Sequence, residues 1–89
     1  MKITKRNGNL VMYDDEKLVR SILKANRETN EELTTSAAAY LSDVVIGRLA
    51  KEHDIITTAL IREGVYRALM ERGLPMTAQH YRDYSKTEA

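Results

Sequence analysis

Three cations near the N-terminus have the residue types and spacing of an anion-binding corner. Lys5 and Arg6 precede Asn7-Gly8, a pair that favours a tight hairpin turn, and Lys17 lies one turn into the helix predicted to follow. The amides at a helix start carry partial positive charge, so phosphate oxygens would find both donors and a favourable field there. Charge-assisted hydrogen bonds contribute about 1.5–3 kcal/mol each, which makes phosphate binding the chemistry to expect.

An ordinary surface role for Lys5 and Arg6 remains open at this point. Consecutive residues point to opposite faces of an ideal strand, so both side chains reach one ligand only if the turn twists them together. On physical grounds alone, a solvated Lys-Arg pair at a hairpin tip is the commoner arrangement.

The elements that must position these cations are a hairpin and the helix after it. Residues 2–13 alternate well enough for two short strands. Asp14 or Asp15 can cap a helix that runs to about Arg27. This helix has an apolar side, made of Leu18, Val19, Ile22, Leu23 and Ala25, and a basic stripe, made of Lys17, Arg20, Lys24 and Arg27.

A second helix and a short extended segment follow the polar connection at residues 28–32. Residues 34–36 offer caps for a helix ending near His53, the longest in the chain. It is apolar on nearly every side between Ala37 and Ile46, which predicts a central element with several neighbours. Residues 54–57 are short and β-branched, which favours a third strand beside the hairpin.

Two further helices complete the predicted bundle. Thr57 or Thr58 can cap a helix that ends near Arg72, and Gly64 on its apolar side indicates close approach of another backbone. Gly73 can adopt the left-handed conformation that ends a helix, and Thr77 can start a last short helix carrying Tyr81 and Tyr84. The fold class predicted is α+β, with a small three-stranded sheet or hairpin lid on a bundle of about four helices.

Composition limits the organisation and the chemistry. The 89 residues, 43% of them hydrophobic, suit a single domain over 1–89, and a net charge of +1 requires no nucleic acid or acidic partner. The absence of cysteine excludes disulfides and thiolate metal sites. No apolar run is long enough for a membrane span and no signal peptide is evident, so we expect a cytoplasmic protein with no membrane partner.

The pattern Ile3-x-Lys5-Arg6-Asn7-Gly8 followed by Tyr13-Asp14-x-x-Lys17-Leu18 resembles the opening of the ATP-cone domain. The resemblance extends to Ile55-x-Thr57 before a helix and to Tyr81-x-x-Tyr84 near the end. That family is found in ribonucleotide reductases and in the bacterial repressor of their genes. The resemblance implies a sheet lid over a helical bundle that binds ATP or dATP as an allosteric signal, with no catalytic residues of its own.

The same resemblance assigns roles to individual residues. It places Lys5 and Arg6 on the phosphates, and the segment from Val11 to Lys17, with Asp14 and Lys17 as polar contacts, beside the nucleotide. Ile3, Tyr13 and Leu18 resemble positions that flank the adenine, and Thr57 and Ile61 resemble the opposite wall. For Ile3, Leu18 and Ile61 an ordinary core position is an equal alternative, and Thr57 has a competing role as an N-cap.

This sequence departs from the family pattern at two places. Val11 stands where some members carry an acidic residue that contacts the base. Ser85 and Lys86 stand where an arginine commonly follows the last tyrosine, and a lysine lacks the planar fork that binds phosphate through two hydrogen bonds.

Regulation by assembly is the mechanism that the resemblance implies. Bound ATP or dATP, with Mg²⁺ as its usual companion, would reorganise the lid and adjoining helix surfaces. That change would alter contact with a second copy of the chain, with a ribonucleotide reductase subunit, or with both. A coupling of about 1–3 kcal/mol suffices for such control.

The alternative function is a small nucleic-acid-binding module that uses the basic hairpin and the basic stripe. Against it stand the near-neutral net charge, the acidic cluster of Glu28, Glu31 and Glu32, and the lack of aromatic residues among the cations. Enzymatic activity is disfavoured because the chain has no Gly-rich phosphate loop, no nucleophile with an evident base and no paired carboxylates in a context that suggests a cleft.

Overall fold

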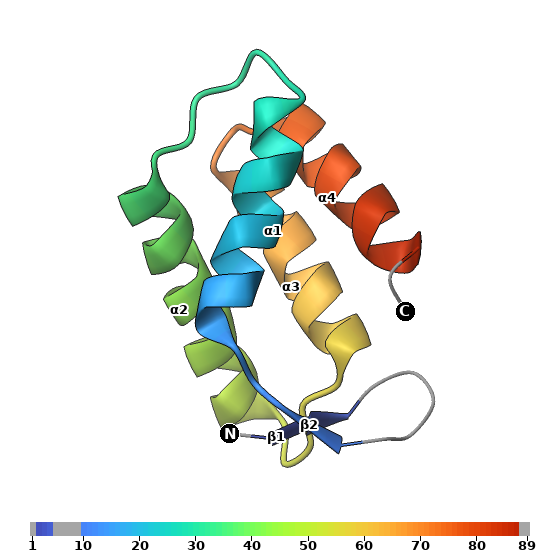
Figure 1. Ribbon diagram of the computed structural model, residues 1–89. Coiled ribbons are helices and arrows are strands. Elements are labelled where there is room, and N and C mark those ends of the chain that lie inside the picture. Colours follow the sequence, from blue (N-terminus) through green and yellow to red (C-terminus); the bar gives the residue numbers. More distant parts are fainter. Residues whose placement is uncertain (1, 5–9, 88–89) are drawn as a thin grey trace.

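The computed structural model describes residues 2–4 and 10–87 as two strands followed by four helices (Figure 1). The strands are β1 (Lys2–Thr4) and β2 (Leu10–Met12). The helices are α1 (Asp15–Arg27), α2 (Thr35–Glu52), α3 (Thr58–Glu71) and α4 (Pro75–Thr87). The four predicted helices are confirmed. None of them, within the described ranges, is both long enough and apolar enough to cross a membrane.

Three of the helices start at residues that the sequence marks as caps. The side chains of Asp14, Thr34 and Thr57 each accept a hydrogen bond of 3.1 Å from the backbone amide three residues further on. This interaction satisfies one of the amides that every helix start leaves without an intrahelical partner. Local sequence therefore determines where α1, α2 and α3 begin.

The third strand predicted at residues 54–57 is wrong. β1 and β2 form a two-stranded antiparallel sheet, and within the described residues the later segment adds only a parallel bridge between Thr4 and Thr57. One hydrogen bond of 3.0 Å, from the Thr4 amide to the Ile56 carbonyl, accompanies this bridge. Because Thr57 is already the N-cap of α3, the chain turns into the helix before a strand can form.

The helices form a ring rather than a cluster around α2. α1 and α3 each pack on both α2 and α4. The prediction that α2 is central is therefore wrong: its outer side exposes 68% of Tyr40 and leaves open space beside Gly47. In a ring of four helices, each helix buries only the side that faces the others. The apolar residues on the other sides of α2 therefore stay at the surface.

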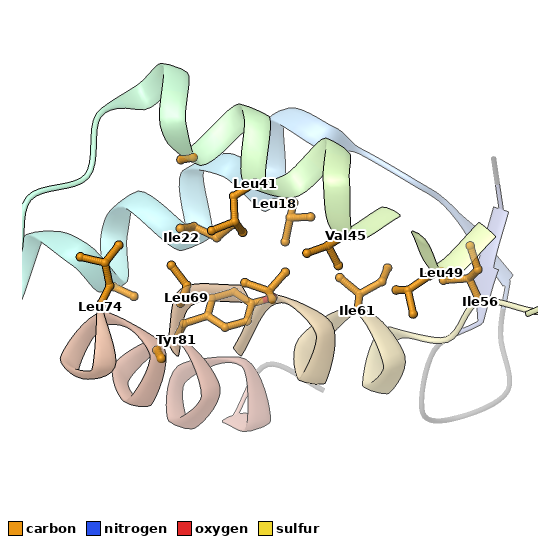
Figure 2. Packing of buried hydrophobic residues seen from close by; sticks show 14 of the residues in the cluster. Leu18, Ile22, Leu41, Val45, Leu49, Ile56, Ile61, Leu69, Leu74 and Tyr81 are labelled. Carbon is orange, nitrogen blue, oxygen red and sulfur yellow. The ribbon is translucent and has the colours of Figure 1, made fainter. Parts of the chain in front are cut away.

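The core runs along the axis of the bundle, from Leu74 and Tyr81 at one end to Ile56 beside the sheet at the other (Figure 2). Gly64 lies where α3 contacts α2. A Cβ atom added to Gly64 would lie 2.8 Å from Cγ1 of Val45. The close neighbour of this glycine is thus a side chain, not the backbone that the sequence led us to expect.

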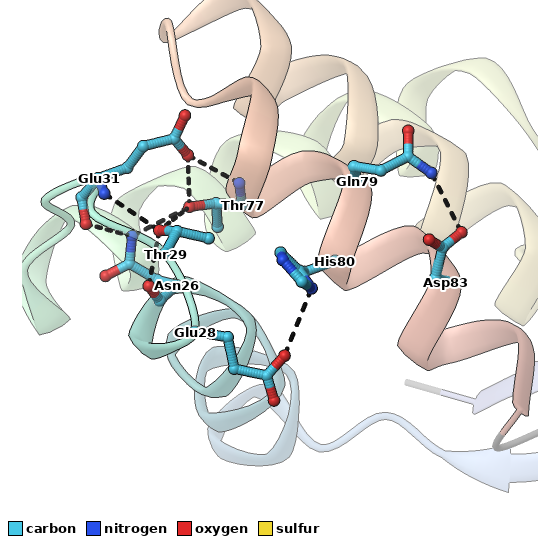
Figure 3. A network of polar contacts seen from close by, with 8 residues as sticks. All are labelled: Asn26, Glu28, Thr29, Glu31, Thr77, Gln79, His80 and Asp83. Carbon is cyan, nitrogen blue, oxygen red and sulfur yellow. Dashed lines mark hydrogen bonds and ion pairs between the residues drawn. The ribbon is translucent and has the colours of Figure 1, made fainter.

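The start of α4 also differs from the prediction. This helix begins at Pro75 rather than Thr77, after Gly73 has taken the predicted left-handed conformation with φ of 84°. Its first amides are bound by Glu31, from the connection between α1 and α2. The Glu31 carboxylate accepts a hydrogen bond of 3.0 Å from the Met76 amide. It also accepts one of 2.7 Å from the Thr77 amide, which Figure 3 shows.

Candidate functional site

α1 and α3 both begin at the sheet, on the same end of the bundle (Figure 1). β2 ends at Met12, two residues before the cap of α1 at Asp14. Thr57 caps α3 and forms the bridge to Thr4 of β1. The positive ends of two helix dipoles are therefore held beside one hairpin, as an anion-binding site requires.

Three of the predicted wall residues belong to the core. Ile3 and Leu18 are each 9% exposed and Ile61 is 6% exposed, and all three lie in one cluster of buried side chains. Each of these residues, from β1, α1 and α3, therefore has the core position that the sequence left open as an alternative. Their low exposure fits a pocket floor that rigid packing holds in place, with little surface left for contact.

Tyr13 packs against this core and carries a polar atom without a partner. Its hydroxyl is buried and has no hydrogen-bond partner in the described part of the chain. Burial, and then the carboxylates of Asp15, Asp43 and Asp14, raise the pKa of Tyr13 to about 12. Since Asp43 belongs to α2, the phenol lies between the start of α1 and α2. It is a neutral hydrogen-bond donor at physiological pH.

The polar residues at the two helix starts are partly engaged by the fold itself. Asp14 and Lys17 are both exposed, and the Lys17 amide donates to Oδ1 of Asp14. The half-buried Thr57 uses its hydroxyl oxygen for the Leu60 amide. The Lys17 ammonium is thus the exposed cation that this end of α1 presents, whereas Asp14 and Thr57 have structural roles that a ligand would share.

Two of the predicted phosphate contacts, Lys5 and Arg6, lie outside the described residues. Val11 is part of β2, opposite Ile3, but its side chain is also outside the described set, as is that of Lys86. Their roles remain predictions.

A contact between α1 and α4 takes one cation out of the basic stripe. Nζ of Lys24 lies 2.5 Å from the hydroxyl of Tyr84 and 4.3 Å from the centre of its ring. Sequence reasoning missed this pair, since 60 residues separate its members. Lys24 therefore helps to hold α4 on α1, which leaves a less continuous row of cations for a nucleic acid.

A pocket of about 270 Å³ lies where the hairpin meets the end of α2 and the segment that leads to α3. Its lining is Thr4, Leu10, Ala50, His53, Asp54, Ile55 and Ile56, which includes none of the predicted site residues.

Across residues 2–4 and 10–87, no group of three or more His, Asp or Glu side chains is placed to hold a metal ion.

Comparison with known proteins agrees with the resemblance drawn from the sequence. The family model described as the ATP cone domain matches residues 1–89, the whole of the chain. A search of curated proteins finds no significant match.

Proposed function

The chain belongs to the ATP-cone domain family, and on that premise we propose that it binds ATP or dATP as an allosteric effector. Domains of this family are nucleotide-binding regulatory modules without catalytic activity of their own. The match over residues 1–89 is the observation that carries the proposal, because it includes both the hairpin with its cations and the three helices that follow α1.

The arrangement at the sheet end supports a phosphate site there. Two helix starts and the exposed Lys17 lie beside the hairpin that carries Lys5 and Arg6 in the sequence. Phosphate oxygens are strong acceptors, and cations together with helix amides are the groups that bind them in proteins. We assign the phosphates to these three cations.

The adenine is assigned to the apolar side of the same corner. Its floor is proposed to be Ile3, Leu18 and Ile61, which are core residues from three different elements. The remaining proposed contacts come from the strand end, the helix start and the opposite wall, and are Val11, Tyr13, Asp14 and Thr57. Mg²⁺ would bind with the nucleotide, coordinated by phosphate oxygens and water.

Control through assembly is the second part of the proposal. Occupation of the corner would tie β1 and β2 to the starts of α1 and α3, and so change the surface that the lid offers to another molecule. The partners proposed are a second copy of the chain and a ribonucleotide reductase subunit, in the cytoplasm. A change in affinity of 5–150-fold corresponds to a coupling of about 1–3 kcal/mol.

Calorimetric titration with ATP, dATP and GTP in magnesium buffer tests the proposal, with light scattering on the same samples. Saturable binding of the adenine nucleotides, weaker binding of GTP and a change in mass on binding would support both parts. Binding without a change in mass would retain the effector site and remove self-assembly.

Failure of ATP and dATP to bind at millimolar concentration would reject the site. Duplex DNA added to the same samples examines the alternative function. Affinity for DNA that falls steeply with salt, in the absence of nucleotide binding, would favour the nucleic-acid-binding module.

A further inference from the structure

The outer face of α2 lies open in the described part of a single chain. Tyr40, Val44 and Gly47 share this face, because residues three, four and seven apart lie on one side of a helix. Tyr40 is 68% exposed and Val44 is 36% exposed. α2 packs on α1 and α3 through its opposite side, which carries its buried residues (Figure 1). An apolar helix face is thus left at the surface.

Gly47 is an unfavourable residue for the interior of α2. Glycine inside a helix costs about 1 kcal/mol relative to alanine. Gly64 of α3 is accounted for by Val45, which a larger side chain would displace, but a Cβ atom added to Gly47 meets nothing within 4 Å. A glycine on an exposed helix face allows the backbone of another element to approach closely.

The pocket at the end of α2 continues the same face. Its lining includes Ala50, which lies on this face three residues after Gly47, together with the exposed Leu10 and Ile55. Asp54 adds a hydrogen-bond acceptor to the lining. A cavity of about 150 Å³ holds a benzene ring, so the pocket, with about 270 Å³, has room for one tyrosine side chain.

Tyr40 and this pocket lie on opposite sides of Gly47 at similar distances. Tyr40 is seven residues before Gly47, and the lining reaches from Ala50 to Asp54, three to seven residues after it. At 1.5 Å per residue, Tyr40 lies about 10 Å from Gly47 along α2, and the pocket about 5–10 Å from it in the other direction. A twofold axis at Gly47 between two antiparallel α2 helices would bring each Tyr40 to the pocket of the other copy.

Two charges on the same face favour the antiparallel arrangement. Asp43 and Lys51 are exposed, and each lies four residues from Gly47, on opposite sides of it. In the antiparallel pair each carboxylate lies level with the ammonium group of the other copy, whereas a parallel pair in register sets like charges level with each other. The face is therefore complementary to itself, as an interface with twofold symmetry requires.

We propose that the outer face of α2 binds a second copy of the chain, with the two α2 helices antiparallel across Gly47 and each Tyr40 in the pocket of the other copy. Tyrosine suits such a pocket, because its ring contacts apolar groups and its hydroxyl finds a polar partner. The pairing goes beyond the proposed function, since it requires no bound nucleotide, and either can fail while the other stands. One helix face with one pocket is a small interface, so we expect a dimer that dissociates readily.

Sedimentation velocity without nucleotide, over a range of protein concentrations, measures the pairing. The wild type should pass from monomer to dimer, and Tyr40→Ala should raise the dissociation constant at least about tenfold, as truncation of a central aromatic contact does. Gly47→Gln should abolish the dimer, although glutamine is the better helix former. A wild type that stays monomeric at about 1 mM, or dimers that both variants form as the wild type does, would overturn the proposal.

Exchange of the two charges tests the antiparallel arrangement. Asp43→Lys alone should weaken the dimer, because it sets two lysines level with each other, and the addition of Lys51→Asp should restore it. Glu71→Lys makes the same change in charge at an exposed position of α3 and should leave the dimer unchanged. A double variant that recovers no affinity would contradict this pairing.

Cross-linking supplies a measurement that does not depend on weakening the dimer. The chain has no cysteine, so Gly47→Cys places a single thiol at the twofold axis, where we expect the two Cα atoms within the roughly 4.4–6.8 Å that a disulfide spans. Under mild oxidation Gly47→Cys should form a covalent dimer faster than Arg67→Cys, which places the thiol at an exposed position of α3. Equal rates for the two variants would place the contact elsewhere and reject the proposal.

Discussion

Glu31 caps the helix that contains Thr77, 46 residues further along the chain. Its Oε1 atom accepts hydrogen bonds of 2.7 Å from both the Thr77 amide and the Thr77 hydroxyl. The fully buried Thr77 hydroxyl in turn accepts from the Asn26 side chain at 3.0 Å (Figure 3). These contacts join the end of α1, the connection after it and the start of α4, at the opposite end of the bundle from the proposed site.

Thr77→Val should destabilise the protein by about 1–3 kcal/mol, because it leaves the buried Asn26 amide and one Glu31 oxygen with fewer partners. Urea unfolding monitored by circular dichroism measures the change. Thr35→Val, at an exposed position, is the control and should have little effect. A variant at position 77 as stable as the control would show that the network contributes nothing to stability.

The contribution of Glu31 should depend on pH. Burial opposes its ionisation, but hydrogen bonds from Thr77 and Met76 and the proximity of His80 outweigh this and hold the pKa of Glu31 below its ordinary value of 4.5. A lowered pKa in the folded state means that the stabilisation is complete above about pH 4.5 and is lost as the pH falls through the folded value.

Thermal unfolding of Glu31→Gln against the wild type tests this dependence. The variant should melt at a lower temperature near neutral pH, and the difference should shrink on acidification below about pH 4.5. A difference in melting temperature that is the same at every pH would contradict the assigned role of the carboxylate.

Tyr13 should respond to pH in the alkaline range. Its pKa is raised to about 12, so the folded state disfavours the phenolate. The contribution of Tyr13 to stability is therefore intact below about pH 10, falls as the pH rises from about 10 to about 12, and levels off above that. Tyr13→Phe should lack this fall, and at neutral pH it should be as stable as the wild type or up to about 1 kcal/mol more stable, since it removes a buried hydroxyl without a partner.

Alkaline unfolding profiles of both chains provide the measurement. The exposed Tyr40 supplies the matched variant, Tyr40→Phe, which should leave stability at neutral pH unchanged. A Tyr13→Phe chain that is much less stable than the wild type at neutral pH would show that the hydroxyl has a partner which the structure does not contain.

The two helical glycines should respond in opposite ways to alanine. Gly64→Ala places a Cβ 2.8 Å from Val45 and should cost about 1–3 kcal/mol through overpacking. Gly47→Ala meets nothing within 4 Å and should stabilise α2 by up to about 1 kcal/mol. The double variant Gly64→Ala with Val45→Ala removes the clashing methyl group, so chemical unfolding should show that their costs do not add. Additive costs would contradict a direct contact.

Features that depend on neighbouring residues could be predicted from the sequence. The caps at Asp14, Thr34 and Thr57 each satisfy an amide three residues away. Gly73 adopts the left-handed conformation, which a residue without a side chain does readily. The prediction of a third strand at residues 54–57 was wrong. β-branched residues form a strand only where a partner strand and enough length are available. Here the segment makes a single bridge before Thr57 begins α3.

Features that depend on distant pairs could not be predicted. No local pattern links Glu31 to α4 or Lys24 to Tyr84, and both pairs form only when the helices pack. The candidate site shows the same division. The local apolar pattern marks Ile3, Leu18 and Ile61 as buried positions, whereas no local signal predicts the burial of the Tyr13 hydroxyl or the influence of Asp43 from α2 on it.

The most direct test of the central claim is an amide NMR titration of the chain with ATP in magnesium buffer. We predict that the signals that move lie at the sheet end, in residues 13–18 at the start of α1 and residues 57–62 at the start of α3. Signals from the Glu31 and Thr77 network at the opposite end should stay in place. Saturable shifts confined to that opposite end, or no shifts at millimolar ATP, would contradict the account.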